Sequence, residues 1–329
     1  MTDRYGVNNN PPEAGVVYRA ILRANEMAPV TLGTMAIVSV AVAVELPTMR
    51  VNHQKEFLSA EAVAEVARAA EDAGFAACFV TDHPAGDATW LDSGGHHALD
   101  PLVALSFAAA ATSRLRLLTH VYILAYRNPF LTAKGALSLD VLSGGRLILG
   151  TAAGYLRPEF GALGVDFNER NELIDEAIDV LRMAWSGEDV AYRGHHFVAR
   201  AVRMRPLPVS RPHPPIWMGG NSYAAIRRAV ERCQGWAPFP SAGIARAAKT
   251  AELRGLEDLR PRIAYARSHA AEVGRSEPFD ICWSLDGGVD RTEIKQLEEE
   301  GITWATVGFP ATDRSSYIDA LRRFADRAL

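Results

Sequence analysis

Cysteine is scarce in this chain, and charge of neither sign dominates it. The 329 residues include three cysteines, Cys78, Cys233 and Cys282, which are far apart and form no C-x-x-C pair. This spacing excludes a disulfide framework and a cysteine-based zinc site, and it favours a reducing compartment such as the cytoplasm. The net charge of −4 argues against nucleic-acid binding, which usually requires a basic surface. We therefore expect a cytoplasmic enzyme that acts on a small molecule.

Apolar runs long enough to cross a bilayer are also missing. Residues 36–46 are mainly apolar but too few to span a membrane. We interpret them as a first buried strand rather than a signal-peptide core, because they are rich in β-branched valine and end at Glu45. Residues 1–30 are polar and rich in turn-forming residues, which predicts a loosely ordered extension before a domain at 31–329.

What is present is a strand–helix–strand pattern in the middle of the chain. Residues 115–123 are rich in Leu, Val, Tyr and Ile, as in a buried strand. An Asn-Pro pair at Asn128 then opens a helix, which ends at the glycine pair beginning with Gly144. The apolar residues 147–149 follow as a second strand. This is one βαβ unit of a buried parallel sheet.

The rest of the chain repeats this unit. Further strands are expected at residues 36–46, 77–81, 216–218, 235–238, 279–285 and 303–307. Further helices are expected at residues 60–73, 102–111, 168–185, 223–233 and 317–328, with a connector containing a hairpin at 187–215. Eight strands alternating with helices predict a (β/α)₈ barrel. An open doubly wound sheet is the alternative, but no G-x-G-x-x-G turn is present to support it.

In a (β/α)₈ barrel the chemistry lies in the loops that follow the strands. Asp82 and His83 end the second strand, where a carboxylate beside an imidazole can orient it or tune it for proton transfer. The alternative is that Asp82 and His83 serve only as a helix cap and a solvated turn. His96 and His97 lie in a long loop, where such residues often contact ligands, although both could be plain surface residues.

Glycine-rich turns follow two other strands. Residues 219–222, Gly-Gly-Asn-Ser, stand between a strand and a helix, where free backbone N–H groups and the helix dipole attract a phosphate. A tight turn without a ligand explains the same residues. Gly150 and Thr151 begin a stretch of small residues that could let a flat ring lie at the barrel mouth. The pair His195-His196 sits at the predicted hairpin, outside the mouth, and we assign it no role.

Several of these segments together resemble the bacterial luciferase-like superfamily, and most closely its deazaflavin (coenzyme F420)-dependent oxidoreductases. The resemblance rests on FVTDH, on RNPFLTAKGALSLDVLSGGRLILG and on RPHPPIWMGGNSYAAIRRA. It extends over residues 36–329 and is densest at 81–240. The superfamily fold is a TIM barrel, in agreement with the strand pattern.

The resemblance implies roles for individual residues. Asp82 and His83 would face the flavin-like ring, with His83 as proton donor or orienting group. Members often have a bulge after the third strand, and we predict a non-proline cis peptide between His120 and Val121. The residues that would bind the cofactor are Thr119, His120, Val121, Gly150, Thr151, Gly219, Gly220, Asn221 and Ser222.

This chain differs at one position from the sugar-phosphate dehydrogenases of this group. They carry an acid just after the fourth-strand glycine, where this chain has Tyr155, so sugar-phosphate oxidation is not expected. Glu159 belongs to the following segment and is not a simple replacement. Aromatic residues near the strand ends point to a hydrophobic organic substrate. The candidate substrate-binding residues are Trp90, His96, His97, Tyr155 and Phe239.

The leading interpretation is an F420-dependent oxidoreductase that transfers hydride to or from a small, hydrophobic substrate. An FMN-dependent monooxygenase supplied by a separate reductase is the second, and a catalytically idle flavin-binding relative is a third. A metal-dependent barrel hydrolase is disfavoured, because no His-x-His follows the first strand and no HExxH occurs, so no metal site is expected. We expect a homodimer with no nucleic-acid or membrane partner.

Overall fold

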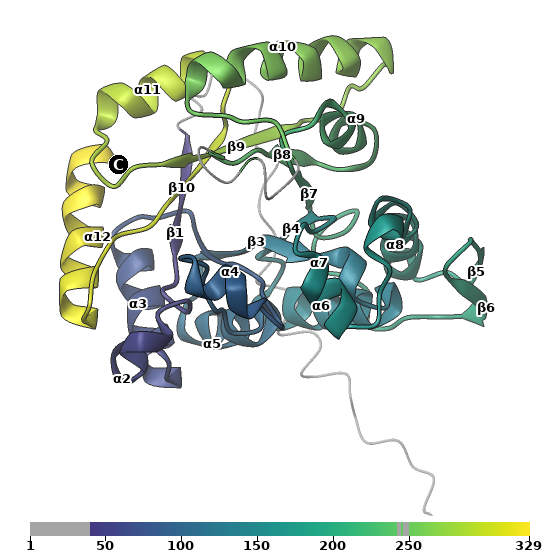
Figure 1. The fold of residues 1–329 in the computed structure, drawn as a ribbon, viewed down its shortest axis with the longest axis horizontal. Coiled ribbons are helices and arrows are strands. Elements are labelled where there is room, and N and C mark those ends of the chain that lie inside the picture. Colours follow the sequence, from purple (N-terminus) through teal and green to yellow (C-terminus); the bar gives the residue numbers. More distant parts are fainter. Residues whose placement is uncertain (1–39, 242–244, 246–249) are drawn as a thin grey trace, which may run out of the picture. The chain divides into compact units, whose positions relative to one another are not determined.

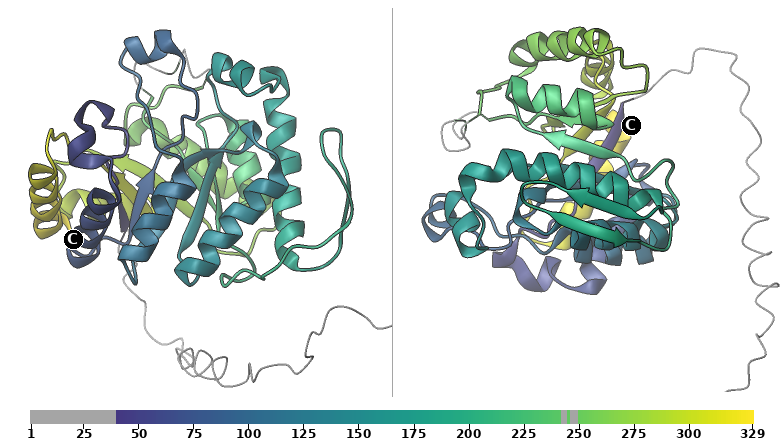
Figure 2. Two further views of the ribbon diagram at one scale, coloured as in Figure 1. Left: turned by 90° about the horizontal axis from the view of Figure 1, so that it is seen from below. Right: turned by 90° about the vertical axis from the view of Figure 1, so that its right-hand side faces the viewer.

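The fold is a closed barrel of eight parallel strands surrounded by helices (Figures 1 and 2). It is taken from a computed structural model that describes residues 40–241, 245 and 250–329. The strands are ordered β1-β10-β9-β8-β7-β4-β3-β2 around the barrel. The predicted (β/α)₈ fold is therefore confirmed. The predicted extension at 1–30 and the beginning of the first predicted strand lie outside the described residues.

Each barrel strand lies where an apolar run predicts it. The strands are β1 Ala41–Glu45, β2 Ala77–Val80, β3 Arg116–Ile123, β4 Leu147–Ala152, β7 Ile216–Gly219, β8 Gly235–Ala237, β9 Asp280–Leu285 and β10 Trp304–Val307. The predicted hairpin is formed by β5 Val190–Arg193 and β6 Val198–Val202, which pair antiparallel.

Eight longer helices and several short ones connect the strands. The longer helices are α3 Ala60–Asp72, α5 Pro101–Ala111, α6 Pro129–Ser143, α8 Arg170–Ser186, α9 Tyr223–Arg232, α10 Leu256–Glu272, α11 Arg291–Glu299 and α12 Arg314–Ala328. The short ones are α2 Gln54–Phe57, α4 Ala88–Asp92 and α7 Arg157–Ala162, with single turns η1 Val51–His53, η2 Leu124–Tyr126 and η3 Phe167–Glu169. None of these helices in the described part of the chain is long and apolar enough to cross a membrane.

Capping residues explain several helix boundaries. The Ser59 side chain accepts a hydrogen bond from the backbone of α3, and Asn128 does the same for α6. Gly144 ends α6 with a left-handed backbone (φ 71°) that suits glycine. The helix predicted at 168–185 begins later, at Arg170 in α8. Asn168, where a cap of this helix would have stood, lies inside η3, and Asp166 accepts its N–H, because a separate turn precedes the helix.

Five helices of the described part of the chain were not predicted: α2, α4, α7, α10 and α11. The helices α10 and α11 bury few apolar side chains, and α2, α4 and α7 are short. Two of the short helices matter most for function, since α4 carries Trp90 and α7 carries Glu159.

The core has two layers. One side chain from each barrel strand fills the interior: Ala43, Ala77, Leu118, Ile148, Trp217, Ala237, Cys282 and Trp304. Alternate residues on the same strands, such as Leu117 and Leu149, pack outward against the helices. This alternation keeps the strands in register and leaves their carboxyl ends open to form a site.

Candidate active site

A bulge in β3 shapes one side of the barrel mouth. The register between β3 and β4 shifts between Thr119 and Tyr122, and the peptide bond between His120 and Val121 is cis, as predicted. The Thr119 hydroxyl donates to the Gly150 carbonyl oxygen (2.8 Å), and the Thr151 hydroxyl donates to that of Tyr122 (2.9 Å). The two threonine side chains therefore fasten the bulge to β4.

Gly150 is required by this close approach of the two strands. A Cβ atom added to Gly150 would lie 2.1 Å from the Thr119 carbonyl oxygen, which is closer than atoms can approach. The sequence interpretation attributed this small residue to room for a ring at the mouth. The structure gives a different reason for the glycine. The Thr119 carbonyl of the neighbouring strand occupies the place where a side chain on Gly150 would begin.

The bulge adjoins the end of β7. A Cβ on Gly219 would lie 3.3 Å from Cγ1 of Val121, so the bulge and the Gly-Gly-Asn-Ser turn meet at one place. His120 packs edge-on against Phe79, and burial lowers its pKa to about 4, so the imidazole is neutral at pH 7. The structure thus brings together two groups of predicted cofactor residues from distant parts of the sequence.

The partner of His83 is a buried glutamate that the sequence analysis set aside. His83 Nδ1 lies 3.5 Å from Glu159 Oε2, and Glu159 is fully buried. The Tyr126 hydroxyl donates to the same oxygen (2.6 Å), and the Ala85 amide donates to the other (3.1 Å). Burial raises the pKa of Glu159, but His83, Tyr126 and the amide outweigh it and leave the pKa below its ordinary value. An ionised carboxylate therefore lies beside the imidazole.

Asp82 has a different partner from the one expected. Its carboxylate accepts two hydrogen bonds from the Arg127 guanidinium (2.6 and 2.9 Å) and one from the Ile123 amide (2.9 Å). The expectation that Asp82 orients the adjacent imidazole was wrong, because both of its oxygens are committed to the end of β3. Asp82 is a positioning residue that joins β2 to the segment after the bulge.

Three of the five predicted substrate residues gather around His83. The ring centroids of Trp90, His96 and Tyr155 lie 4.5, 4.8 and 6.4 Å from that of His83. Burial and the neighbouring His83 lower the pKa of His96 to about 4. The result is a largely neutral, aromatic wall on one side of the imidazole.

The other two predicted substrate residues lie elsewhere. The His97 side chain is exposed to solvent. Phe239 lies after β8, where its backbone exchanges hydrogen bonds with the Asn221 side chain. Contact of these two residues with a substrate stays a prediction.

In the Gly-Gly-Asn-Ser turn, the side chains and the backbone have different roles. The fully buried Asn221 amide donates to the carbonyl oxygens of Phe239 (2.9 Å) and Ala251 (3.1 Å) and accepts from the Phe239 amide. The side chain therefore holds the loop after β8, and a contact of Asn221 with a phosphate stays a prediction. The Ser222 oxygen caps α9 by accepting from Ala225, and its hydroxyl hydrogen can still donate. The anion-binding potential of the turn lies in the backbone at the start of α9.

The chain matches the luciferase-like monooxygenase family over residues 38–299. It belongs to this family. A relative, the uncharacterized protein Rv0940c of Mycobacterium tuberculosis, is 32% identical over 260 residues, covering 74% of this chain and 83% of that protein.

Solved structures share the fold of this luciferase-like protein. The monooxygenase RslO1 from Streptomyces bottropensis superposes with a TM-score of 0.69 at 21% identity, over 87% of this chain and 98% of that one. The coenzyme F420-dependent tetrahydromethanopterin reductase from Methanopyrus kandleri superposes with a TM-score of 0.67 at 18% identity, over 88% and 98%. At these identities the likeness concerns the fold.

Sequence reasoning assigned no role to four residues of the candidate site: Glu45, Tyr126, Arg127 and Glu159. Glu45 ends β1 at the mouth, and burial raises its pKa to about 7 although Arg50, 3.9 Å away, lowers it. Its position at a strand end is a signal that could have found it. Glu159 carries no such signal, because it lies on a short helix inside a loop.

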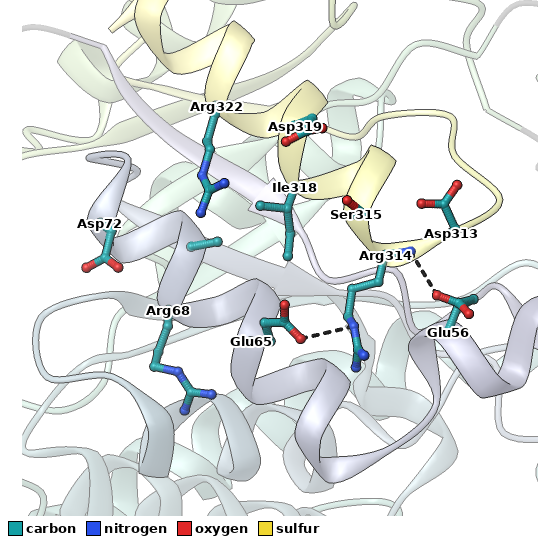
Figure 3. A pocket seen from close by; sticks show the side chains of 11 residues that line it. Glu56, Glu65, Arg68, Asp72, Asp313, Arg314, Ser315, Ile318, Asp319 and Arg322 are labelled. Carbon is teal, nitrogen blue, oxygen red and sulfur yellow. Dashed lines mark hydrogen bonds and ion pairs between the residues drawn. The ribbon is translucent and has the colours of Figure 1, made fainter.

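A separate cavity of about 480 Å³ lies between α3 and α12 on the outer wall of the barrel (Figure 3). Its lining is mostly acids and arginines. The Arg314 guanidinium lies 3.0 Å from the Glu65 carboxylate, and the Arg314 amide donates to Glu56. The ion pair joins α12 to α3 and the amide hydrogen bond joins α12 to α2, and we assign the cavity no part in the chemistry.

Proposed function

We propose that this luciferase-like protein is an F420-dependent oxidoreductase that transfers hydride to or from a small, hydrophobic organic substrate. The observation that carries the proposal is the ionised, buried Glu159 beside His83 at the mouth of the barrel. A carboxylate in this position orients the imidazole, and His83 can then give a proton to the substrate or return one. Trp90 and Tyr155 shield the imidazole from water on one side.

The residues at the mouth fit the deazaflavin cofactor of this proposal. Val121 and Gly219 meet at the bulge and present a small, apolar surface against which a flat ring can lie. The backbone N–H groups and the dipole at the start of α9 suit its phosphate. His120 Nδ1 is buried without a hydrogen-bond partner among the described residues, so it has a free polar atom beside the bulge. A bound deazaflavin would supply the carbon that accepts or donates the hydride.

Titration of the purified apoprotein separates the two cofactor candidates. We expect deazaflavin to bind several-fold more tightly than FMN, because the motifs resemble the deazaflavin branch most closely. The difference is modest since both ligands share a ring system and a phosphate. Fluorescence quenching measures both dissociation constants. Equal or tighter binding of FMN would contradict the proposal and favour an FMN-dependent monooxygenase served by a separate reductase.

The neighbouring helices α5 and α6 support a homodimer in this proposal (Figure 1). Their outer faces expose large apolar side chains that a monomer would leave in water. These are Val103, Phe107, Leu131 and Leu142, with exposed fractions of 58, 48, 75 and 80%. A second copy of the chain, packed through the same face, would cover them.

Replacing Leu131 and Leu142 together by aspartate is expected to convert the dimer to a monomer in analytical ultracentrifugation. Four charges placed across a two-fold interface repel one another and lose their burial. The matched control is Val198→Asp, which changes a similarly exposed apolar residue (60%) on the hairpin and should leave a dimer. A monomeric parent protein, or a double variant that stays dimeric, would rule out this interface.

A further inference from the structure

A group of side chains of the kinds that ligate metals lies outside the barrel mouth, where the β5–β6 hairpin runs beside α8 (Figure 1). Glu172 belongs to the first turn of α8, and His195 and His196 form the tip of the hairpin. One oxygen of Glu172 and one ring nitrogen of each histidine lie within 4.8 Å of one another. Two imidazoles and a carboxylate are a common protein ligand set for divalent transition metals.

The spacing of these atoms suits a metal better than a hydrogen bond. Glu172 Oε2 lies 3.5 Å from His195 Nδ1 and 3.6 Å from His196 Nε2. A hydrogen bond between such groups is about 2.7–3.2 Å long, so both separations are too long for one. Two ligands at about 2.0–2.2 Å from a tetrahedral zinc ion are about 3.3–3.6 Å apart. Both carboxylate–imidazole separations therefore match those of neighbouring ligands around one ion, and all three atoms lie within 4.8 Å of one another.

The hairpin is held in this position by another carboxylate. Glu176, one turn further along α8, accepts hydrogen bonds from the amides of His195 (2.6 Å), His196 (3.1 Å) and Phe197 (3.2 Å). A Cβ on Gly194 would lie 2.1 Å from Glu176 Oε2, so glycine at this position permits the contact. The backbone that carries both histidines is thus fixed without a metal, which lowers the entropy lost when one binds.

His196 also has the surroundings of a metal ligand. Its Nε2 atom is buried and has no hydrogen-bond partner within the described part of the chain. Its other nitrogen, Nδ1, faces the Glu169 carboxylate at 3.6 Å. A carboxylate behind a ligating imidazole is the usual second partner of a metal-bound histidine. The exposed side chains of His195 and Glu172 leave a path for the ion to enter.

We propose that Glu172, His195 and His196 form a binding site for a zinc-like divalent transition metal, with water completing the coordination. The ion would join the hairpin tip to α8. This site is independent of the barrel mouth and of the cofactor bound there.

Calorimetric titration of the full-length protein with Zn²⁺ tests the site. We expect one ion per chain, with affinity lowered at least tenfold by either His195→Asn or Glu172→Gln. The matched controls are His53→Asn and Glu188→Gln, which change a histidine and an exposed carboxylate elsewhere and should bind as the parent does. His97→Asn tests the only other adjacent histidine pair in the sequence, His96-His97.

Thermal unfolding supplies a second measurement that does not depend on heat of binding. Zinc should raise the melting temperature of the parent protein and of the controls, but not that of Glu172→Gln, whose metal-free melting temperature should equal the parent's. The absence of zinc binding by the parent, unchanged affinity in both ligand variants, or loss of binding in His97→Asn would overturn the proposal.

Discussion

Replacing His83 by alanine is expected to lower turnover about 10²- to 10⁴-fold, the usual contribution of a positioned general acid or base. Cofactor affinity should change little, because the ring surface at Val121 and Gly219 and the start of α9 are untouched. The measurements are kcat, on a substrate found by screening small hydrophobic organic molecules, and the dissociation constant for deazaflavin by fluorescence.

Two further variants decide what the His83 result means. His53→Ala removes a histidine on the single turn η1, away from the His83–Glu159 pair, and should keep parental turnover. Glu159→Gln removes the charge beside His83 while keeping the shape of the side chain, and should lower kcat by less than His83→Ala. Full turnover by His83→Ala would show that the imidazole is structural and that the proton transfer proposed for it is wrong.

The Asp82→Ala variant is expected to lose about 3–5 kcal/mol of unfolding free energy, the cost of breaking a buried ion pair from one side. Asp82 is 2% exposed, and its removal leaves the largely buried Arg127 guanidinium without its two charged hydrogen bonds. The Ile123 amide loses its acceptor as well. Urea denaturation followed by circular dichroism measures the change.

An exposed ion pair provides the control for this prediction. Asp189 and Arg203 are 2.6 Å apart, but each side chain is more than half exposed. Asp189→Ala should therefore change stability by at most about 1 kcal/mol. A similarly small loss for Asp82→Ala would contradict the structural role assigned here to Asp82 and return it to the candidates for direct catalysis.

The fold could be predicted from the sequence because its determinants are local. Apolar runs such as residues 115–123 match β3, and the caps at Ser59 and Asn128 mark where α3 and α6 begin. Each signal depends on residues within a few positions of one another. The predicted cis bond at His120-Val121 came from family resemblance and is present as well.

The partners within the candidate site could not be predicted in the same way. Sequence adjacency suggested that Asp82 orients His83, but consecutive residues leave the end of a strand in different directions. The barrel turns Asp82 toward Arg127 and brings Glu159, from a short helix much later in the chain, against the imidazole. Asn221 was judged by its place in a glycine-rich turn, while its buried contacts after β8 determine what its side chain does.

By itself, the sequence determined the barrel, the order of its strands along the chain and the strand ends at which polar residues gather. These follow from apolar periodicity, capping and turn residues, which act over one or two turns of chain. Only the tertiary structure decided that the Glu159 carboxylate lies beside His83. It also decided that glycine is needed at position 150, where the Thr119 carbonyl of the neighbouring strand comes close. It also decided that the histidines of the hairpin face Glu172. These contacts join residues far apart in sequence, and their geometry depends on how the helices pack around the closed sheet.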